Sequence, residues 1–350
     1  MAGCFLLYGA NGYTGELTTR AAATRGLRPV LAGRNRAALE PLARELGLEL
    51  RSFGLDDPKA VDEGLAGMDA VLHCAGPFSR TAKPMAEACL RTKTHYLDIT
   101  GEIPVFESMA ARDGLAKAAG VMLLPGVGFD VVPSDCLAAH LKRKLPRATR
   151  LTLAFFSSAG WSRGTATTMI ENIDKGGLIR RDGKLVRVPS AWKAREIDFG
   201  RGPRPCVTIP WGDVSTAYYS TGIPNIEVYT AAPLRMRVGM KLARPFARLL
   251  GSAPAQRLLK ARVRRGAAGP SAEVRARALA VLWGEVSDAR GGRAAARLRT
   301  PEGYTLTVLT SLAIVERVLQ GHAPAGFKTP SLAYGADFIL GIAGVTREDL

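Results

Sequence analysis

The sequence predicts an α/β protein with two parts: a doubly wound parallel sheet first, then a second, mixed α+β domain. Three observations support this prediction. A glycine-rich turn separates an apolar run at residues 4–7 from a helix-compatible segment at 16–24. Strand-like and helix-like patterns then alternate through residues 1–125. After residue 150 the pattern changes to several strands separated by turns, which is typical of a largely antiparallel sheet.

The turn at residues 8–15 reads Tyr-Gly-Ala-Asn-Gly-Tyr-Thr-Gly. Its first glycine permits a tight turn, its second lets backbone N–H groups approach a pyrophosphate, and its third allows the helix to pack closely on the strand. The N-terminus of that helix adds partial positive charge, which attracts phosphates. We therefore expect a dinucleotide here, bound by Gly9, Asn11, Gly12, Tyr13, Thr14 and Gly15.

The end of the second predicted strand, residues 29–32, indicates which dinucleotide binds. An NAD site usually has an acid about 20 residues past the glycines, where it bonds the ribose 2′-hydroxyl. This chain has Gly33 and then Arg34, with no acid. Because a guanidinium can bind a 2′-phosphate through two hydrogen bonds, the sequence predicts NADP(H). The alternative is that Arg34 is a solvated residue. Asn35 is expected to cap a helix over residues 36–46 and to lie beside the cofactor.

Later strands are expected at residues 50–53, 69–74, 94–98 and 120–124, with a helix over 105–118. After the strand at 69–74, the loop containing Ala75, Gly76 and Pro77 should let the backbone approach the cofactor. Polar residues cluster at two further strand ends, which should open onto the same crevice. The sequence leaves open whether they serve catalysis or structure. These candidates are Tyr96, Asp98, Glu102 and Asp130.

The second domain begins with a predicted strand at residues 151–156, a polar loop at 157–165 and a helix at 166–175. The loop-to-helix junction contains Arg163 and Thr165, which suit an anionic group of a substrate. A hairpin is expected to turn at Asp182-Gly183, followed by strands at 226–230, 278–287 and 294–299. Helices are expected at 305–319 and 332–342. The predicted division is 1–135, 136–325 and 326–350.

The net charge of +17 is concentrated in one section. Residues 235–299 contain 16 Lys and Arg against three acids, and residues 237–249 form a cationic amphipathic pattern interrupted by Pro245. For residues 235–265 we consider three interpretations: a solvated helical segment, contact with an anionic membrane, or docking of an acidic carrier protein. Nucleic acid is not expected, because the section has almost no interleaved aromatic residues.

Five scattered cysteines, with no Cys-x-x-Cys spacing, predict reduced thiols, and four scattered histidines indicate no metal site. No run of 18 apolar residues exists, so a membrane-spanning helix is not expected. We expect a cytoplasmic protein, with a peripheral position at the inner membrane face as an alternative.

The motifs at residues 8–15, 32–35, 74–78, 95–102 and 128–135 resemble those of the saccharopine dehydrogenase-like oxidoreductases. The similarity is greatest to a bacterial branch that includes trans-acting enoyl reductases. This resemblance implies a Rossmann domain that binds NADP(H), and an inserted α/β domain for contacts with substrate and within a homodimer. It also implies a C-terminal helix that returns to the first domain.

Three functions remain open. The first is an NADPH-dependent reductase of a C=C (enoyl) or C=N bond in an acyl or carboxylate-bearing substrate, with Tyr96, Asp98 and Glu102 in the crevice. The second is an NADP(H)-binding module with little turnover that docks on a membrane or a carrier protein. The third is a saccharopine-type amino-acid dehydrogenase. A short-chain dehydrogenase mechanism is disfavoured, because no Tyr is followed four residues later by Lys.

Overall fold

The structure is a computed structural model that describes residues 3–350, and contacts within the chain divide it into two units. Unit 1 runs up to Val132 and includes Tyr304–Tyr334, whereas unit 2 comprises Pro133–Gly303 and Gly335–Leu350. The first boundary lies three residues from the predicted one at 135. Residues 304–325, predicted as part of the second domain, belong to unit 1, and the predicted segment 326–350 is shared between the two units.

Unit 1 is built on a seven-stranded sheet with the order β15-β6-β5-β4-β1-β2-β3, and every described pairing in it is parallel. Chain order reverses between β1 and β4, so a crevice is expected at the carboxyl ends of these two strands. The doubly wound sheet is therefore confirmed. The strands are β1 (Phe5–Tyr8), β2 (Val30–Gly33), β3 (Leu50–Ser52), β4 (Ala70–His73), β5 (His95–Asp98), β6 (Met122–Leu124) and β15 (Gly326–Phe327).

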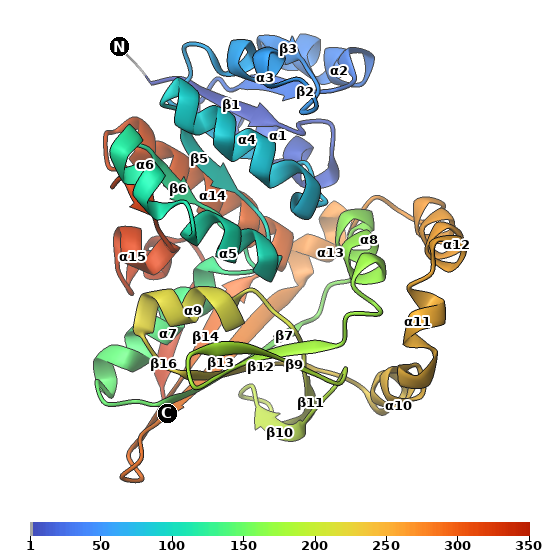
Figure 1. Cartoon of the computed structure of the whole chain (residues 1–350), viewed down its shortest axis with the longest axis vertical. Helices are drawn as coiled ribbons and strands as arrows, with labels where there is room; N and C mark the ends of the chain where they lie inside the picture. Colours follow the sequence, from blue (N-terminus) through green and yellow to red (C-terminus); the bar gives the residue numbers. More distant parts are fainter. Residues whose placement is uncertain (1–2) are drawn as a thin grey trace. The chain divides into compact units, whose positions relative to one another are not determined.

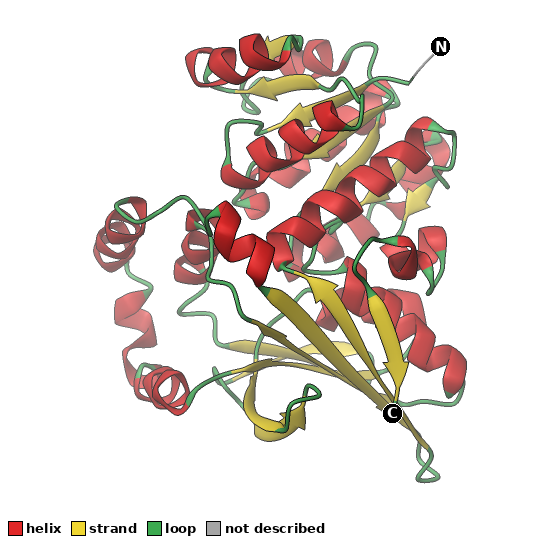
Figure 2. Cartoon of the chain, turned by 180° about the vertical axis from the view of Figure 1, so that it is seen from behind, coloured by secondary structure: helices red, strands yellow, loops and turns green. Residues whose placement is uncertain are grey.

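Helices cover both faces of this sheet (Figures 1 and 2). Helix α14 lies beside α1, because the rings of Tyr13 and Tyr304 are 5.1 Å apart and Arg25 pairs with Glu316 at 3.5 Å. The helix predicted over 105–118 is two helices, since Asp113 and the glycine after it begin a new one. The helices are α1 (Tyr13–Thr24), α2 (Arg36–Leu46), α3 (Pro58–Leu65), α4 (Phe78–Thr92), α5 (Ile103–Ala110), α6 (Asp113–Ala119) and α14 (Gly303–Leu319).

Unit 2 contains a mixed sheet with the order β10-β11-β12-β7-β13-β14-β16, and a hairpin of β8 and β9 attached to β12. The hairpin turns at Asp182 (φ +48°) and Gly183 (φ +77°), as predicted. The strands are β7 (Arg150–Ser157), β8 (Gly177–Arg181), β9 (Lys184–Val188), β10 (Ala194–Asp198), β11 (Pro203–Thr208), β12 (Asn225–Ala231), β13 (Leu279–Ser287), β14 (Arg293–Pro301) and β16 (Thr346–Asp349).

The basic section of unit 2 is helical but broken, as the proline at its centre predicts. Helix α10 ends at Leu242, and a single 3-10 turn that contains Pro245 follows it. The helical elements of the unit are α7 (Val132–Lys144), α8 (Arg163–Glu171), α9 (Asp213–Thr221), α10 (Leu234–Leu242), η1 (Arg244–Phe246), α11 (Ala247–Leu250), α12 (Ala253–Arg264) and α13 (Ala272–Arg277). No helix within residues 3–350 is both long and apolar enough to cross a bilayer.

The helix predicted over residues 332–342 does not form as one piece. Helix α15 (Pro330–Tyr334) stops at Gly335, whose φ of +86° is incompatible with continuing the helix, and only a 3-10 turn, η2 (Phe338–Gly341), follows. The chain then adds β16 to the edge of the unit 2 sheet, where Asp349 accepts a hydrogen bond from the ring of His140 at 2.6 Å. The C-terminal part of the chain that returns to unit 1 therefore consists of α14, β15 and α15.

The contact between the glycine turn and α1 can be tested by substitution. A Cβ added at Gly15 would lie 2.2 Å from the carbonyl oxygen of Gly9, so Gly15→Ala forces the helix away from the turn. Overpacking of this kind costs about 1–3 kcal/mol, which urea unfolding would measure. Gly114→Ala is the matched control, because its Cβ would meet no atom within 4 Å and the helix should be unaffected or slightly stabilised. Equal stability of both variants would contradict the packing argument.

Candidate functional site

The glycine turn between β1 and α1 leaves room for a diphosphate. Gly9 has φ +87° and accepts a hydrogen bond from the Gly12 N–H at 3.0 Å, which closes the turn. A Cβ at Gly12 would come within 3.3 Å of the same oxygen. Within residues 3–350 no side chain caps the N-terminus of α1, and Asn11 and Gly12 are exposed. A helix start without a side-chain cap is a typical phosphate site when backbone N–H groups are in reach, so the geometry fits the predicted cofactor.

Arg34 follows β2 at the same edge of the sheet, and its side chain is exposed. Among residues 3–350 no carboxylate forms an ion pair with it, whereas Arg36 pairs with Glu40 at 2.9 Å. Asn35 caps α2 as predicted, accepting a hydrogen bond from the Ala38 N–H at 3.2 Å. Arg34 is therefore the cation at this strand end that remains available for a 2′-phosphate.

The loop after β4 lies directly against the glycine turn. A Cβ added at Gly9 would be 2.9 Å from both the Cβ and the backbone nitrogen of Ala75. The Thr81 hydroxyl donates a 2.7 Å hydrogen bond to the Ala75 carbonyl and thereby holds the loop. Gly76 and Pro77 continue it to the start of α4. The structure thus brings together two of the predicted cofactor segments.

Tyr96 and Asp98 are both fully buried at the end of β5. The Tyr96 hydroxyl donates to Asp98 Oδ2 at 2.6 Å, and the N–H groups of Thr100 and Gly126 donate to Oδ1 at 2.9 and 2.8 Å. Burial raises the pKa of Asp98 to about 6, although these hydrogen bonds act in the opposite direction. The carboxyl group therefore joins the ends of β5 and β6, and neither side chain of the pair is open to a ligand.

Glu102 directly precedes α5, and its side chain reaches the N-terminus of α4. Its carboxylate accepts hydrogen bonds from the N–H groups of Phe78 at 2.8 Å and Ser79 at 2.9 Å. These are two of the backbone donors that a helix start leaves without helical partners. The contact ties the end of β5 to the loop after β4, which is a positioning role.

Asp130 is partly exposed, as is Glu102, whereas Tyr96 and Asp98 are fully buried. Its carboxyl group packs on the backbone of Gly101, where an added Cβ would lie 2.6 Å from Oδ2. Burial raises its pKa to about 7. The adjacent loop is fixed by α14, since the Thr307 hydroxyl accepts from the Phe129 N–H at 3.0 Å. Asp130 is thus a partly exposed residue whose carboxyl group can hold or release a proton near neutral pH.

The sequence reasoning missed His73, the last residue of β4. The parallel register places it level with Tyr8 on one side and Asp98 on the other. Its ring is fully buried near Tyr8, Phe78 and Tyr96, and neither ring nitrogen has a partner among the described residues. Burial lowers the pKa of His73 to about 3, so the ring is neutral. The sequence does contain a sign of this residue, because a histidine ends the otherwise apolar strand β4.

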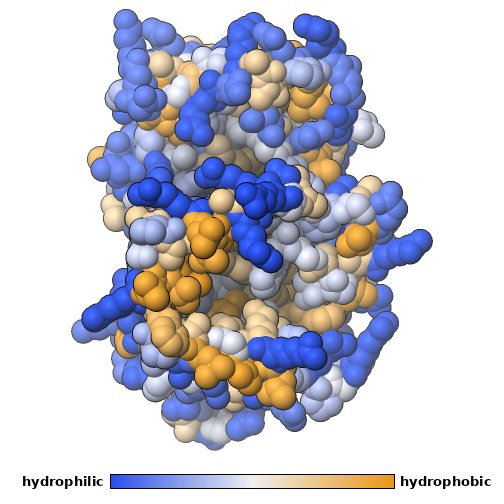
Figure 3. Space-filling view, turned by 90° about the vertical axis from the view of Figure 1, so that its right-hand side faces the viewer, coloured by the Kyte–Doolittle hydropathy of each residue, from blue (hydrophilic) through white to orange (hydrophobic). Residues whose placement is uncertain are grey.

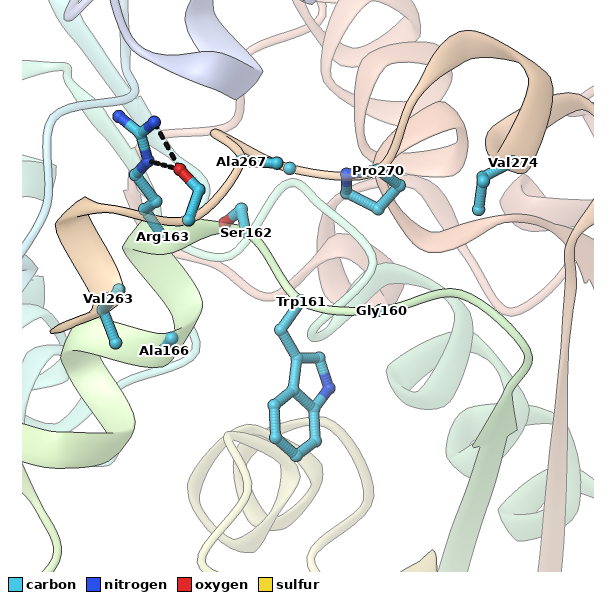
Figure 4. Close-up of a pocket in the computed structure, with 11 residues that line it drawn as sticks. Gly160, Trp161, Ser162, Arg163, Ala166, Val263, Ala267, Pro270 and Val274 are labelled. Atoms are coloured by element: carbon cyan, nitrogen blue, oxygen red, sulfur yellow. Dashed lines mark hydrogen bonds between the residues drawn. The ribbon is translucent and has the colours of Figure 1, made fainter.

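Arg163 lines a cavity of about 470 Å³ in unit 2, and Thr165 lies two residues further along the chain (Figure 4). The Arg163 guanidinium donates to the Gly266 carbonyl through Nε at 2.9 Å, and Ser162 caps α8 by accepting from the Thr165 N–H at 3.3 Å. The Arg163 guanidinium and the N-terminus of α8, which together suggested an anion site, thus both have hydrogen-bond partners within the protein. The remaining lining is mostly apolar, from Trp161, Ala166, Val263, Ala267, Pro270 and Val274.

Comparison with known proteins agrees with this geometry. Residues 5–124 match the family model of the saccharopine dehydrogenase NADP binding domain. The match confirms the predicted resemblance and the prediction of NADP(H) as the cofactor. It covers the strands and helices from β1 to β6, which include the glycine turn, Arg34 and the loop after β4.

Among curated proteins, the chain is 28% identical over 221 residues to a trans-acting enoyl reductase of Mycobacterium ulcerans. That alignment covers 57% of this chain and 52% of the relative. For the Mycobacterium leprae protein of the same name, identity is 32% over 40% of this chain and 35% of the relative. A saccharopine dehydrogenase-like oxidoreductase of Bos taurus is 29% identical over 40% of this chain and 37% of its own length. The chain thus spans about half the length of these relatives or less.

A solved structure resembles nearly the whole chain. Saccharopine dehydrogenase (L-Glu forming) from Saccharomyces cerevisiae, in its apo form, superposes with a TM-score of 0.68 over 99% of this chain and 100% of its own. The sequence identity is 14%, so the likeness establishes the fold of both units and no more.

Replacing Arg34 tests which cofactor the site selects. Arg34→Ala should weaken NADP(H) binding by about 1.5–3 kcal/mol, as expected for the loss of a charge-assisted contact, with little change for NAD(H). Calorimetric titration of both cofactors measures the difference. Arg36→Ala is the control, because this neighbouring guanidinium is already paired with Glu40. Equal losses for the two cofactors would show that Arg34 does not contact the 2′-phosphate.

The buried carboxyl group of Asp98 should make stability depend on pH. Its pKa rises from 3.8 to about 6 on folding, so the folded state binds the proton more tightly and stability falls as pH rises between these values. A shift of this size corresponds to roughly 3 kcal/mol. Urea unfolding across this window should show a smaller slope for Asp98→Asn, whose amide oxygen can still accept both N–H groups. The exposed Glu63→Gln variant should keep the full slope, and an unchanged slope in Asp98→Asn would contradict the assignment.

Proposed function

We propose that this chain, whose residues 5–124 match an NADP-binding domain, is an NADPH-dependent reductase of a C=C bond in an acyl substrate. The observation that carries the proposal is the half-buried carboxyl group of Asp130, with a pKa near 7, in the same unit as a cradle that fits NADP(H). The names of the mycobacterial relatives support the enoyl class of substrate. The wider class, an NADP-dependent oxidoreductase, is also supported by the bovine relative.

Reduction of a double bond requires a hydride and a proton. Bound NADPH supplies the hydride. The chain's own contribution is to hold the cofactor through the α1 N-terminus and Arg34, and to provide the proton. Because the pKa of Asp130 is about 7, about half of the molecules carry a protonated Asp130 near neutral pH. The protonated carboxyl group can donate its proton to the substrate carbon. The resulting carboxylate regains its proton from solvent, which its partial exposure permits.

The other polar candidates are less suited to donate. The Tyr96 hydroxyl is fully buried and already donates to Asp98, and burial together with that carboxylate holds the pKa of Tyr96 well above its usual range. The Glu102 carboxylate is used by two backbone N–H groups. These three residues therefore position the strand ends, whereas Asp130 is the candidate acid.

The cavity in unit 2 supports an acyl substrate rather than an amino acid with several carboxylates. Its lining by Trp161, Val263 and Val274 suits an alkyl chain. A saccharopine-type substrate would require several cations, whereas the described lining contains one, Arg163, whose Nε and one Nη already donate to the Gly266 carbonyl. This observation favours the enoyl reaction over amino-acid chemistry.

The experiment is to incubate the chain with NADPH and a panel of α,β-unsaturated acyl thioesters of increasing chain length, with cyclic imines as a second class. We expect NADPH oxidation with the thioesters and saturated acyl product by mass spectrometry. Tight NADPH binding without oxidation of any substrate would favour a cofactor-binding module with little turnover. Oxidation with imines alone would move the proposal to C=N reduction.

Asp130→Asn tests the proton donor. Loss of a positioned general acid should lower kcat by roughly 10²–10⁴-fold without weakening NADPH binding. In the unaltered chain the acid must be protonated, so activity should fall as pH rises through about 7, and this limb should be absent in Asp130→Asn. Glu63→Gln, a surface carboxylate on α3, serves as control. A variant with full activity would exclude Asp130 as the donor.

A further inference from the structure

Four successive helical segments of unit 2, α10, η1, α11 and α12, contain no buried residue. Large apolar side chains on them are instead exposed, between 45% and 73%. Figure 3 shows an orange band on the side of the molecule that carries these segments in Figure 1. The most exposed are Leu234, Leu242, Phe246, Leu249 and Leu258.

Helix α10 shows how this exposure arises. Met236 and Met240 pack against the buried cluster of Ala191, Val207 and Ala232, which attaches the helix to the unit. Leu234 and Leu242 belong to a stripe that also includes Val238, spaced four residues apart. At 100° per residue this stripe lies on the side opposite the two methionines. The helix therefore has two apolar faces, and one of them faces solvent.

The same segments are strongly cationic. Residues 228–272 contain ten Lys and Arg and no Asp or Glu. Within residues 3–350 Lys260 is the one among the ten that pairs with a carboxylate, Glu171 at 2.7 Å, while Arg244 donates to the main-chain carbonyls of Ser190 and Ala191. The cations on α10 lie at the borders of the leucine stripe, with Arg235 on one side and Lys241 on the other.

We propose that α10, η1, α11 and α12 form a docking surface for an anionic phospholipid membrane, on which the exposed leucines and Phe246 enter the headgroup region and the cations contact lipid phosphates. Interleaved apolar and cationic residues are typical of helices that lie in a bilayer interface. An acidic protein would satisfy the charges, but apolar side chains spread over four segments match a continuous apolar layer better than one fixed pocket. This surface is independent of the proposed reductase activity.

The test is flotation of the full chain with vesicles of phosphatidylcholine, alone or mixed with phosphatidylglycerol. We expect the chain to float with the anionic vesicles at low salt, to remain in the lower fractions with neutral vesicles, and to be partly released at high salt because screening weakens the charge contacts. Enzyme activity is not part of this measurement, so a failed reductase proposal would leave the result intact.

Two sets of exposed substitutions separate the contributions. Leu242→Ser with Leu249→Ser should weaken partitioning by at least ~10-fold, because each leucine loses its apolar burial in the interface. Leu115→Ser with Leu332→Ser is the control on exposed leucines elsewhere. The charge set, Arg235→Glu, Lys241→Glu and Arg248→Glu, should weaken partitioning by ~100-fold, at about 1 kcal/mol per lost cation. Its control at equal net charge is Lys184→Glu, Arg201→Glu and Arg290→Glu, all exposed.

Three outcomes would overturn the proposal. The first is a chain that does not float with anionic vesicles at low salt. The second is an equal loss in the surface sets and their controls, which would indicate unspecific attraction by net charge. The third is a chain that ignores the vesicles but binds an acidic acyl carrier protein through the same cations, which would assign the surface to a protein partner. Unfolding midpoints equal to that of the unaltered chain establish that the variants are folded.

Discussion

The carbonyl oxygen of Gly9 occupies the place where a side chain at residue 15 would begin, and the carboxyl edge of the unit 1 sheet depends on this contact. It lets α1 start directly above β1, with its first N–H groups at the switch point of the strand order. The same glycine turn packs against Ala75, so the loop after β4 is drawn to the cofactor side. Glu102 then joins that loop to the end of β5, and Asp98 joins β5 to β6. A series of close contacts thus connects the ends of β1, β4, β5 and β6 along the carboxyl edge of the sheet.

Features with local causes could be predicted from the sequence. The glycine turn, the Asn35 cap and the Asp182-Gly183 hairpin each depend on residues within a few positions of one another, and the structure contains all three. Strands that rely on distant partners were missed. The β10 strand contains three charged residues, β11 contains two prolines, and β16 reads Thr-Arg-Glu-Asp, so none of them shows an apolar strand pattern. They form because an existing sheet edge offers them hydrogen bonds.

The candidate site shows the same limit. Asp98, Glu102 and Asp130 look equivalent in sequence, since each follows or ends a predicted strand. What separates them is tertiary: one is buried among three donors, one caps a helix, and one rests on a glycine with part of its surface open. Likewise, the amphipathic pattern of the basic section was visible in the sequence, but only the packing of Met236 and Met240 shows which face of α10 is left outside.

The pairing of β15 with β6 has a consequence for biosynthesis. Met122 and its partner Gly326 are separated by Pro133–Gly303 of unit 2, so this edge of β6 has no neighbouring strand while the ribosome makes the intervening residues. The unpaired edge of a strand can form hydrogen bonds with another chain and so promote aggregation. From the synthesis of β6 until residues 326–327 are made, the nascent chain therefore carries one open sheet edge.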